Sequence, residues 1–265
     1  MAKRRTLIIT EVALAIALAA VLNVLQLRLP INFMGGSISL AMLPIALVAL
    51  RRGPLSGMIV GTAFGCINLL IEPLILMPIQ VILDYPLPYL LFGFGVGCYS
   101  KLYNKYANRS DQGAIGRFLA QGSFIIIIAV ILGGILRLIP HTLSGVFFFS
   151  EYAGDFFAAT PSFLFFPGAV DSGLNVWVYS IAYNATYLIP SLICVAVCLL
   201  VIAPILAKAV PVQSAATVQR VKAQQEQLKK QQEAAKAQAA PAEVQQAPAS
   251  EQAKTPEDKP DAKPE

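Results

Sequence analysis

Six long apolar segments separated by short polar ones account for most of the first 207 residues. They lie at about residues 7–28, 38–50, 54–71, 76–98, 118–139 and 174–207. A helix that crosses a membrane needs about 20 mostly apolar residues. The pattern therefore predicts an all-α polytopic membrane protein, a six-transmembrane-helix bundle. The second segment is short for a full crossing, and the residues before it, Pro30–Ser37, could dip into the membrane as irregular backbone that lines a cavity.

The first apolar segment follows the basic sequence MAKRR and could be read as a signal peptide. The run from Leu7 to Leu27 exceeds a typical signal-peptide core and lacks a clear cleavage site before the next segment. We interpret it as a retained first helix. Within it Ala13 and Ala17, and likewise Ala15 and Ala19, are four residues apart, a spacing that lets another helix approach closely, within the bundle or in a partner.

Composition supports the membrane class and separates a tail. The chain is 56% hydrophobic and 13% charged, with a mean hydropathy of +0.64, so a soluble globular protein is excluded. Residues 211–265 are rich in Ala, Gln, Lys and Pro, which predicts a disordered tail. We therefore expect two parts, a membrane domain at 1–210 and a low-complexity tail at 211–265.

Basic residues occupy alternate loops between the apolar segments, at 3–5, 51–52, 101–117 and 208. Because cytoplasmic loops carry an excess of Lys and Arg, we expect a multi-pass protein of the cell membrane with both termini cytoplasmic. The pI near 9.0 reflects these loops and does not indicate nucleic-acid binding. The Phe-rich stretch 146–167 falls on the outer side and is too broken to span, so a loop or short hairpin is expected there as a lid.

The cysteines offer no metal site. Cys66, Cys98, Cys194 and Cys198 lie in apolar segments without a CxxC pattern, and the chain has one histidine. We interpret them as small buried hydrophobic side chains, and no metal or other cofactor is expected.

The fourth apolar segment carries an acid. Gln80 and Asp84 are four residues apart and share a helix face, with Tyr85 adjacent, while Pro86 and Pro88 should break or kink the helix. A carboxylate at membrane depth is costly unless paired or wetted, and is a functional candidate. The structural alternative is an ion pair between Asp84 and Arg137.

The remaining candidates lie on the last two apolar segments. RLIPHTLSG contains His141, and Pro140 suggests that its helix ends there, while Tyr179 and Asn184 lie on the sixth segment. With Asp84 and Tyr85 they would suit a small, flat, cationic heterocycle. Tyr179 and Asn184 are about 140° apart on an ideal helix, so both should reach one ligand only if Tyr179 lies at a distorted helix start.

Four motifs in order, GGSISLAMLPIAL followed by RRG, PIQVILDY, LRLIPHTLSG and VWVYSIAYNATYLIPS, resemble the thiamine-specific substrate-binding components of energy-coupling factor (ECF) transporters, the ThiT or YuaJ family. The resemblance covers about residues 5–207. It implies a six-helix protein that captures thiamine from outside and works with an ECF transmembrane component and two ATPase subunits. No GxxxxGK[ST] nucleotide motif occurs in this chain, so a partner must supply the energy.

The resemblance also implies roles for individual residues. It points to Asp84 as counter-ion, to His141 beside the pyrimidine ring, and to Tyr85, Tyr179 and Asn184 as further contacts. Phe149 stands where part of the family has Trp, and Asp84 where part has Glu. Phe149 and Gln80 complete the candidate site, and the Ala13 and Ala17 stripe is implied to dock the transmembrane partner.

Two alternatives remain open at this stage. One is the same class of transporter with another small vitamin, such as riboflavin, or a thiamine precursor. The other is an intramembrane enzyme using His141 and Asp84 as base and acid, although no Ser or Cys nucleophile has a motif partner. We expect a transporter subunit and not an enzyme.

Overall fold

The computed structural model describes residues 2–29, 35–107, 121–159 and 175–209, together with short helical stretches between 223 and 233. The chain divides into two compact units, Met1–Val212 and Gln213–Glu265. Most of the tail, for which disorder is predicted, lies outside the described residues, as do residues 30–34 of the first connection. The account below concerns the first unit.

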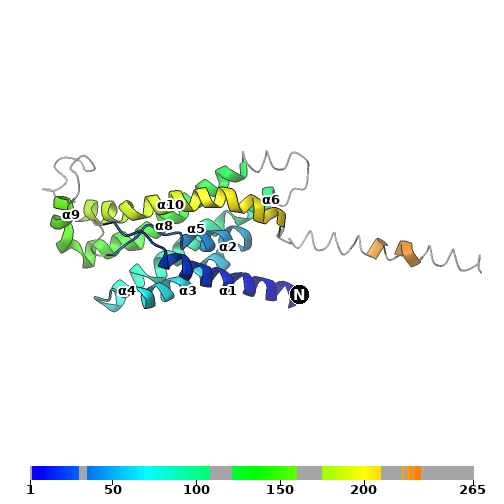
Figure 1. Ribbon diagram of the computed structural model, residues 1–265, viewed down its shortest axis with the longest axis horizontal. Coiled ribbons are helices and arrows are strands. Elements are labelled where there is room, and N and C mark those ends of the chain that lie inside the picture. The colour runs from blue at the N-terminus through cyan, green and yellow to red at the C-terminus, as the bar shows by residue number, and fades with distance from the viewer. Residues whose placement is uncertain are drawn as a thin grey trace, which may run out of the picture. The chain divides into compact units, whose positions relative to one another are not determined.

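The first unit is built from helices, as Figure 1 shows. Apart from one isolated bridge between Leu27 and Ile38, no strand pairing occurs among the described residues. The predicted all-α class is therefore confirmed. In chain order the helices are α1 (Ala2–Val24), α2 (Met42–Arg52), α3 (Pro54–Ile71), α4 (Pro78–Asp84), α5 (Pro86–Cys98), α6 (Ser100–Ala107), α8 (Ser123–Phe148), the 3-10 turn η2 (Ser150–Tyr152), α9 (Ala153–Ala159) and α10 (Asn175–Ala209).

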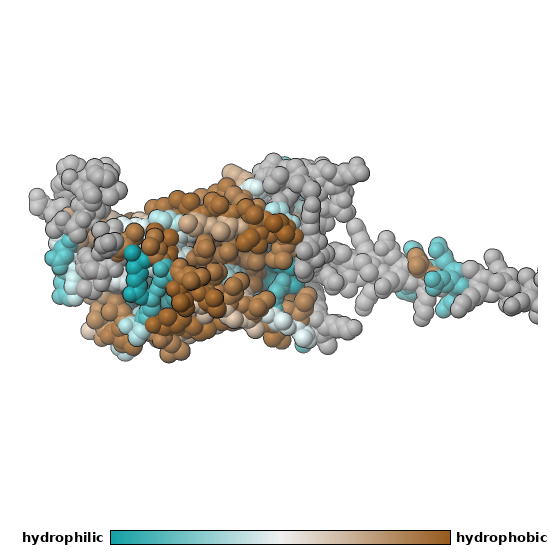
Figure 2. All heavy atoms as spheres, viewed as in Figure 1, coloured by the Kyte–Doolittle hydropathy of each residue, from teal (hydrophilic) through white to brown (hydrophobic). Residues whose placement is uncertain are grey.

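Five stretches of the described chain are long and apolar enough to cross a membrane, namely Arg5–Val24, Pro54–Ile71, Pro78–Cys98, Ser123–Phe148 and Val176–Leu206. Figure 2 shows the corresponding hydrophobic surface in brown over the middle of the unit. On α8 the exposed residues Ile127, Ile131, Ile135 and Ile139 recur every fourth position. A stripe of this kind suits contact with lipid tails and would be unfavourable in water.

The second apolar segment forms the centre of the bundle and does not span it. Helix α2 has 11 residues, so it is only about 16 Å long. It packs against α1, α3 and α5, and Ile45, Ala49 and Leu50 have no exposed surface. The expectation of a short second segment is thus confirmed, with five spanning helices arranged around a buried sixth.

Basic residues gather at one end of the unit, which we call the basic end. Glu11 of α1 forms ion pairs with Arg51 and Arg52, which close the last turn of α2. Asn104 of α6 donates to the Arg51 carbonyl oxygen at 3.1 Å. Cations at a helix C-terminus are favourable because the carbonyl groups there point outward without partners. These contacts fix the relative positions of α1, α2 and α6.

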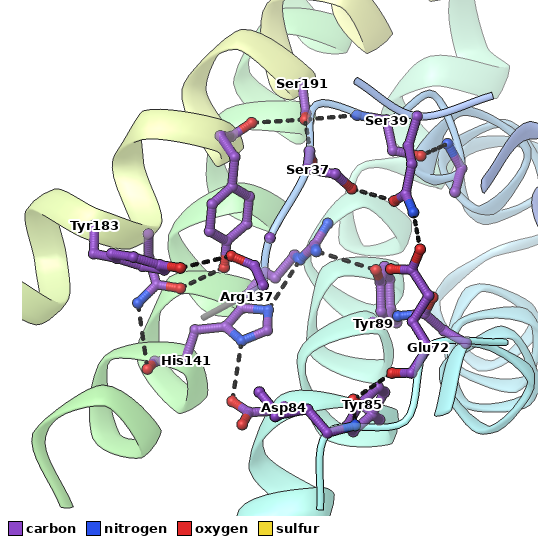
Figure 3. Close-up of a pocket in the computed structure, with 18 of the residues that line it drawn as sticks. Ser37, Ser39, Glu72, Asp84, Tyr85, Tyr89, Arg137, His141, Tyr183 and Ser191 are labelled. Atoms are coloured by element: carbon purple, nitrogen blue, oxygen red, sulfur yellow. Dashed lines mark hydrogen bonds and ion pairs between the residues drawn. The ribbon is translucent and has the colours of Figure 1, made fainter. Parts of the chain in front are cut away.

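The fourth apolar segment is broken where its prolines predict. Helix α4 ends at Asp84 and α5 begins at Pro86, with Tyr85 between them at φ −114° and ψ −78°. Pro86 lacks the N–H that would continue the ladder and disfavours helical geometry at the residue before it. The break turns the Asp84 and Tyr85 side chains toward the interior of the unit (Figure 3).

The expectation that the fifth helix ends at Pro140 is wrong, because α8 continues to Phe148. The last turns are held from both sides. The Ser144 hydroxyl donates to Asp84 of α4, and the Ser180 hydroxyl of α10 donates to the Thr142 carbonyl, each at 2.8 Å. These two bonds tie the turns that follow Pro140 to α4 and α10.

The outer Phe-rich stretch is helical where it is described, which corrects the predicted loop or hairpin. Helix α9 lies beyond the end of α8 and packs on α10. Phe156 has no exposed surface, and its ring centroid lies 5.5 Å from those of both Tyr179 and Tyr183. Residues 160–167 of this stretch lie outside the described residues.

The interpretation of the cysteines as buried in the protein is also wrong. Cys66, Cys98 and Cys194 are exposed on the surface of the unit, and Cys198 is half-buried. They lie on spanning helices, so an apolar sequence context reflects the lipid-facing surface here and not the core. Among the described residues, no cluster of His, Cys, Asp and Glu could hold a metal ion.

Helices α3 and α5 approach closely through glycines. A Cβ atom on Gly61 would collide with the Tyr89 carbonyl oxygen, and one on Gly65 with that of Tyr85. Gly57 and Gly93 face each other in the same way. Backbone cannot rotate out of such a contact as a side chain can, so the two helices must separate if a methyl group is added.

We therefore expect Gly61→Ala to destabilise the protein by about 1–3 kcal/mol, the usual effect of overpacking. The measurement is the thermal unfolding midpoint in detergent, which should fall by several degrees. Gly154→Ala is the matched control, because a Cβ at Gly154 on α9 meets no atom within 4 Å. Equal unfolding midpoints for the two variants would contradict the close backbone contact between α3 and α5 at Gly61.

Candidate functional site

A cavity of about 480 Å³ opens at the end of the unit opposite the basic end. It is formed by the C-terminal ends of α1 and α3, the connection before α2, helix α4, the start of α5, the second half of α8 and the first half of α10. Its lining includes all seven candidates, which are Gln80, Asp84, Tyr85, His141, Phe149, Tyr179 and Asn184. The structure thus brings together candidates from three separate parts of the chain, 80–85, 141–149 and 179–184.

Asp84 is held by three side chains. Its Oδ2 atom accepts hydrogen bonds from the Gln80 amide at 2.6 Å and from the Ser144 hydroxyl at 2.8 Å. His141 Nδ1 lies 3.5 Å from Oδ1. The Asp84 side chain keeps 18% exposure, so the carboxylate is fixed in orientation yet remains open toward the cavity. Such a group can bind a cation without first reorganising.

Arg137 does not pair with Asp84, which removes the structural alternative for this acid. Its guanidinium carbon lies 4.2 Å from the ring centroid of Tyr89, and Nη2 donates to the Tyr89 hydroxyl at 3.2 Å. Nε donates to Nε2 of His141 at 3.4 Å. Figure 3 shows the imidazole between Arg137 and Asp84. These contacts fit the tautomer in which Nδ1 carries the proton toward Asp84.

Tyr85 and Gln80 fix the connection between α3 and α4. The Tyr85 hydroxyl donates to the Glu72 carbonyl and accepts from the Leu74 amide, both at 2.7 Å. Gln80 has no exposed surface, donates to the Leu74 carbonyl at 3.1 Å and accepts from the Leu76 amide at 3.0 Å. Because the Tyr85 hydroxyl is already engaged, its ring is the part of the side chain that a ligand would meet.

Helix α10 contributes a column of aromatic rings. Tyr179 and Tyr183 have ring centroids 5.8 Å apart, and Tyr183 and Tyr187 lie 6.4 Å apart. The Tyr187 ring also meets His141 edge-on at 6.4 Å. A flat cationic ligand would find electron-rich ring faces along this side of the cavity.

Asn184 holds α10 against α8. Its amide donates to the Ser180 carbonyl at 2.8 Å and to the His141 carbonyl at 3.4 Å, and its oxygen accepts from the Tyr187 hydroxyl. Tyr179 lies within α10, which begins at Asn175, so the described residues do not show it at a distorted helix start. Tyr179 and Asn184 both line the cavity because it wraps around more than one face of α10.

Residues 35–39, which we call the strap, cross the cavity from α1 toward α2 as irregular backbone. Gly36 has φ +90°, and a Cβ there would collide with the Tyr187 ring. The Tyr183 hydroxyl donates to the Gly35 carbonyl at 2.8 Å, and the Ser39 amide donates to the Ser191 hydroxyl at 3.1 Å. The described part of this connection therefore lines the cavity, as expected for irregular backbone in a membrane protein.

Several lining residues were missed from the sequence. Arg137 is one helical turn before His141, and this spacing could have identified it as a lining residue. Glu72 and Arg28 form an ion pair between the two connections on this side of the bundle. Nothing in the local sequence indicates that pairing, because the partners are far apart in the chain. Phe149, directly after α8, is buried and lines the cavity.

Comparison with known proteins agrees with this fold. The chain is 32% identical over 206 residues to the thiamine transporter ThiT of Bacillus subtilis. The aligned region covers 75% of this chain and 93% of that protein. It is 25% identical over 185 residues to the thiamine transporter ThiT of Lacticaseibacillus paracasei, covering 68% of this chain and 79% of that protein. A solved structure of ThiT from Listeria monocytogenes matches with a TM-score of 0.60 and 26% identity, covering 78% of this chain and 97% of that chain.

Residues 9–160 match the family described as thiamine transporter protein (Thia_YuaJ). That family consists of transport proteins, so the enzyme alternative built on His141 and Asp84 falls away. Together with the five candidate spans and the match along most of the Bacillus subtilis relative, this shows that the chain is a multi-pass membrane transporter belonging to the thiamine transporter protein family.

Proposed function

We propose that this chain binds thiamine from outside the cell in the cavity and delivers it through an ATP-driven energy-coupling module. The observation that carries the proposal is Asp84, an oriented carboxylate open to an otherwise aromatic and polar cavity. Pockets for small molecules occupy about 300–1,000 Å³, and the cavity has about 480 Å³. We choose thiamine as the ligand because the similar proteins are named thiamine transporters.

The chemistry of thiamine fits the lining. The molecule joins an aminopyrimidine to a thiazolium ring with a permanent positive charge. Asp84 supplies the opposite charge, and the rings of Tyr179 and Phe149 supply flat apolar contacts. In this proposal His141 and Asn184 exchange one of their present partners for a pyrimidine nitrogen atom. In this proposal Tyr85 contacts the ligand with its ring, and Gln80 orients Asp84.

The distribution of charge supports the orientation. Arg51 and Arg52 lie at the basic end, and the cavity lies at the other. With the basic end inside, both termini are cytoplasmic and the cavity opens outward. In this proposal residues 1–210 form the binding domain, and residues 211–265 form a cytoplasmic tail.

The energy-coupling partner is proposed to bind α1. Ala13 and Ala17 are exposed, whereas Ala15 and Ala19 are buried against the bundle. The first pair thus leaves a small-residue face open to another helix. An ECF transmembrane component with two ATPase subunits would supply the energy that this chain does not generate.

Replacing Asp84 by Asn should weaken thiamine binding about 10- to 100-fold, since two opposite charges about 4 Å apart in a partly exposed site attract by about 1–4 kcal/mol. The amide keeps the size of the side chain while removing its charge. Calorimetric titration of the detergent-solubilised protein measures the change, with riboflavin as the ligand control.

Asp155→Asn provides the matched protein control, because Asp155 is an exposed carboxylate on α9. It should leave thiamine affinity unchanged. Equal thiamine affinity of the wild type and the Asp84 variant would contradict the counter-ion role of Asp84. Tight binding of riboflavin without binding of thiamine would show that the ligand is not thiamine.

Bulky residues on the open face of α1 should separate binding from transport. We expect Ala13→Trp with Ala17→Trp to abolish thiamine uptake by cells while the purified protein keeps its thiamine affinity. The control places Trp at two other small exposed positions, Cys66 on α3 and Cys194 on α10. Co-purification of the module with the α1 variant at the wild-type level would locate the contact elsewhere.

A further inference from the structure

The mouth of the cavity carries an ion pair that the proposed contacts do not use. Arg28 follows α1 and Glu72 follows α3, with side-chain exposures of 66% and 31%. Gln26 also donates to the Glu72 carboxylate, and the Ser37 hydroxyl of the strap donates to Gln26. All four residues line the same cavity as Asp84. The pair is therefore the most solvent-accessible charged part of the binding site.

The arrangement of the lining sets the direction of the ligand. Asp84, His141 and Asn184, which suit the ring system, lie among the helices, where His141 and Asn184 are buried. Arg28 and Glu72 lie at the opening. A thiamine whose aminopyrimidine is innermost would place its hydroxyethyl group toward the opening. That hydroxyl is the position at which thiamine is phosphorylated.

We infer that the Arg28–Glu72 pair sets how strongly this site discriminates between thiamine and its phosphate esters. The inference rests on the proposed thiamine site. A guanidinium binds phosphate in a two-pronged geometry. Glu72 occupies that guanidinium and repels a phosphate placed beside it, so the intact pair favours the free alcohol.

The exposure of Arg28 makes the exchange of partners feasible. Ion pairs open to solvent contribute little stability, so Arg28 can leave Glu72 at small cost when another anion arrives. The remaining penalty is the uncompensated repulsion between the phosphate and Glu72. Neutralising Glu72 removes this penalty and frees Arg28, whereas neutralising Arg28 leaves the repulsion alone.

The experiment compares calorimetric affinities for thiamine and thiamine monophosphate in the wild type, Glu72→Gln, Arg28→Gln and the double variant. The ester affinity relative to thiamine should rise about tenfold in Glu72→Gln and fall about tenfold in Arg28→Gln, the scale of one charge in a partly exposed site. When Arg28 is already replaced by Gln, adding Glu72→Gln should raise the ratio of ester affinity to thiamine affinity by less than it does in the wild type, because no guanidinium is then freed.

Glu151→Gln is the control for long-range charge, because Glu151 is an exposed carboxylate near the same end but outside the cavity lining. It should leave the ratio unchanged. The same ratio in all the variants would overturn the inference, as would a rise in Glu151→Gln equal to that in Glu72→Gln. Failure of the wild type to bind thiamine is a separate outcome, which would overturn the proposed function itself.

Discussion

The central constraint on this structure is the cost of placing one carboxylate among membrane helices. A buried charge is tolerated only when hydrogen bonds replace the water it loses. Asp84 receives these bonds from its own helix through Gln80 and from α8 through Ser144. Gln80 in turn holds the backbone of the connection that ends at α4. Satisfying the acid therefore ties together α4, α8 and the connection after α3, which together form one side of the cavity.

The two ends of the bundle are built on different principles. Toward the basic end, α2 is enclosed by α1, α3 and α5, and Gly57 and Gly93 bring α3 and α5 into backbone contact. Close packing of this kind resists rearrangement. Toward the cavity, connections supply much of the wall, and hydrogen bonds replace apolar packing. Tyr183 bonds the strap at Gly35, and Tyr85 bonds the next connection at Glu72. A closely packed scaffold thus positions a site whose walls are held by hydrogen bonds.

The sequence predicted features that depend on local spacing. Hydrophobic runs located the spanning helices, the i, i+4 relation placed Gln80 beside Asp84, and Pro86 located the helix break. It failed where tertiary contacts override a local signal. Pro140 does not end α8, because α4 and α10 hold the turns that follow it. The exposed cysteines show a second limit, since an apolar segment does not reveal whether a residue faces lipid or protein. The Arg28–Glu72 pair joins residues 44 positions apart, and no periodicity encodes such a pairing.

Helix α1 joins the proposed ligand site to the proposed partner surface. Ala15, Ala19 and Asn23 are buried on one face, and the Asn23 amide donates to Asn68 of α3 at 2.8 Å. Ala13 and Ala17 are exposed, and Arg28 follows the helix at the cavity mouth. A ligand that alters the contacts of Gln26 or Arg28 therefore acts on the end of the helix whose exposed side would meet the module. Ligand binding in the cavity can affect the module only if the module binds the ligand-free and ligand-bound forms of this chain with different affinities.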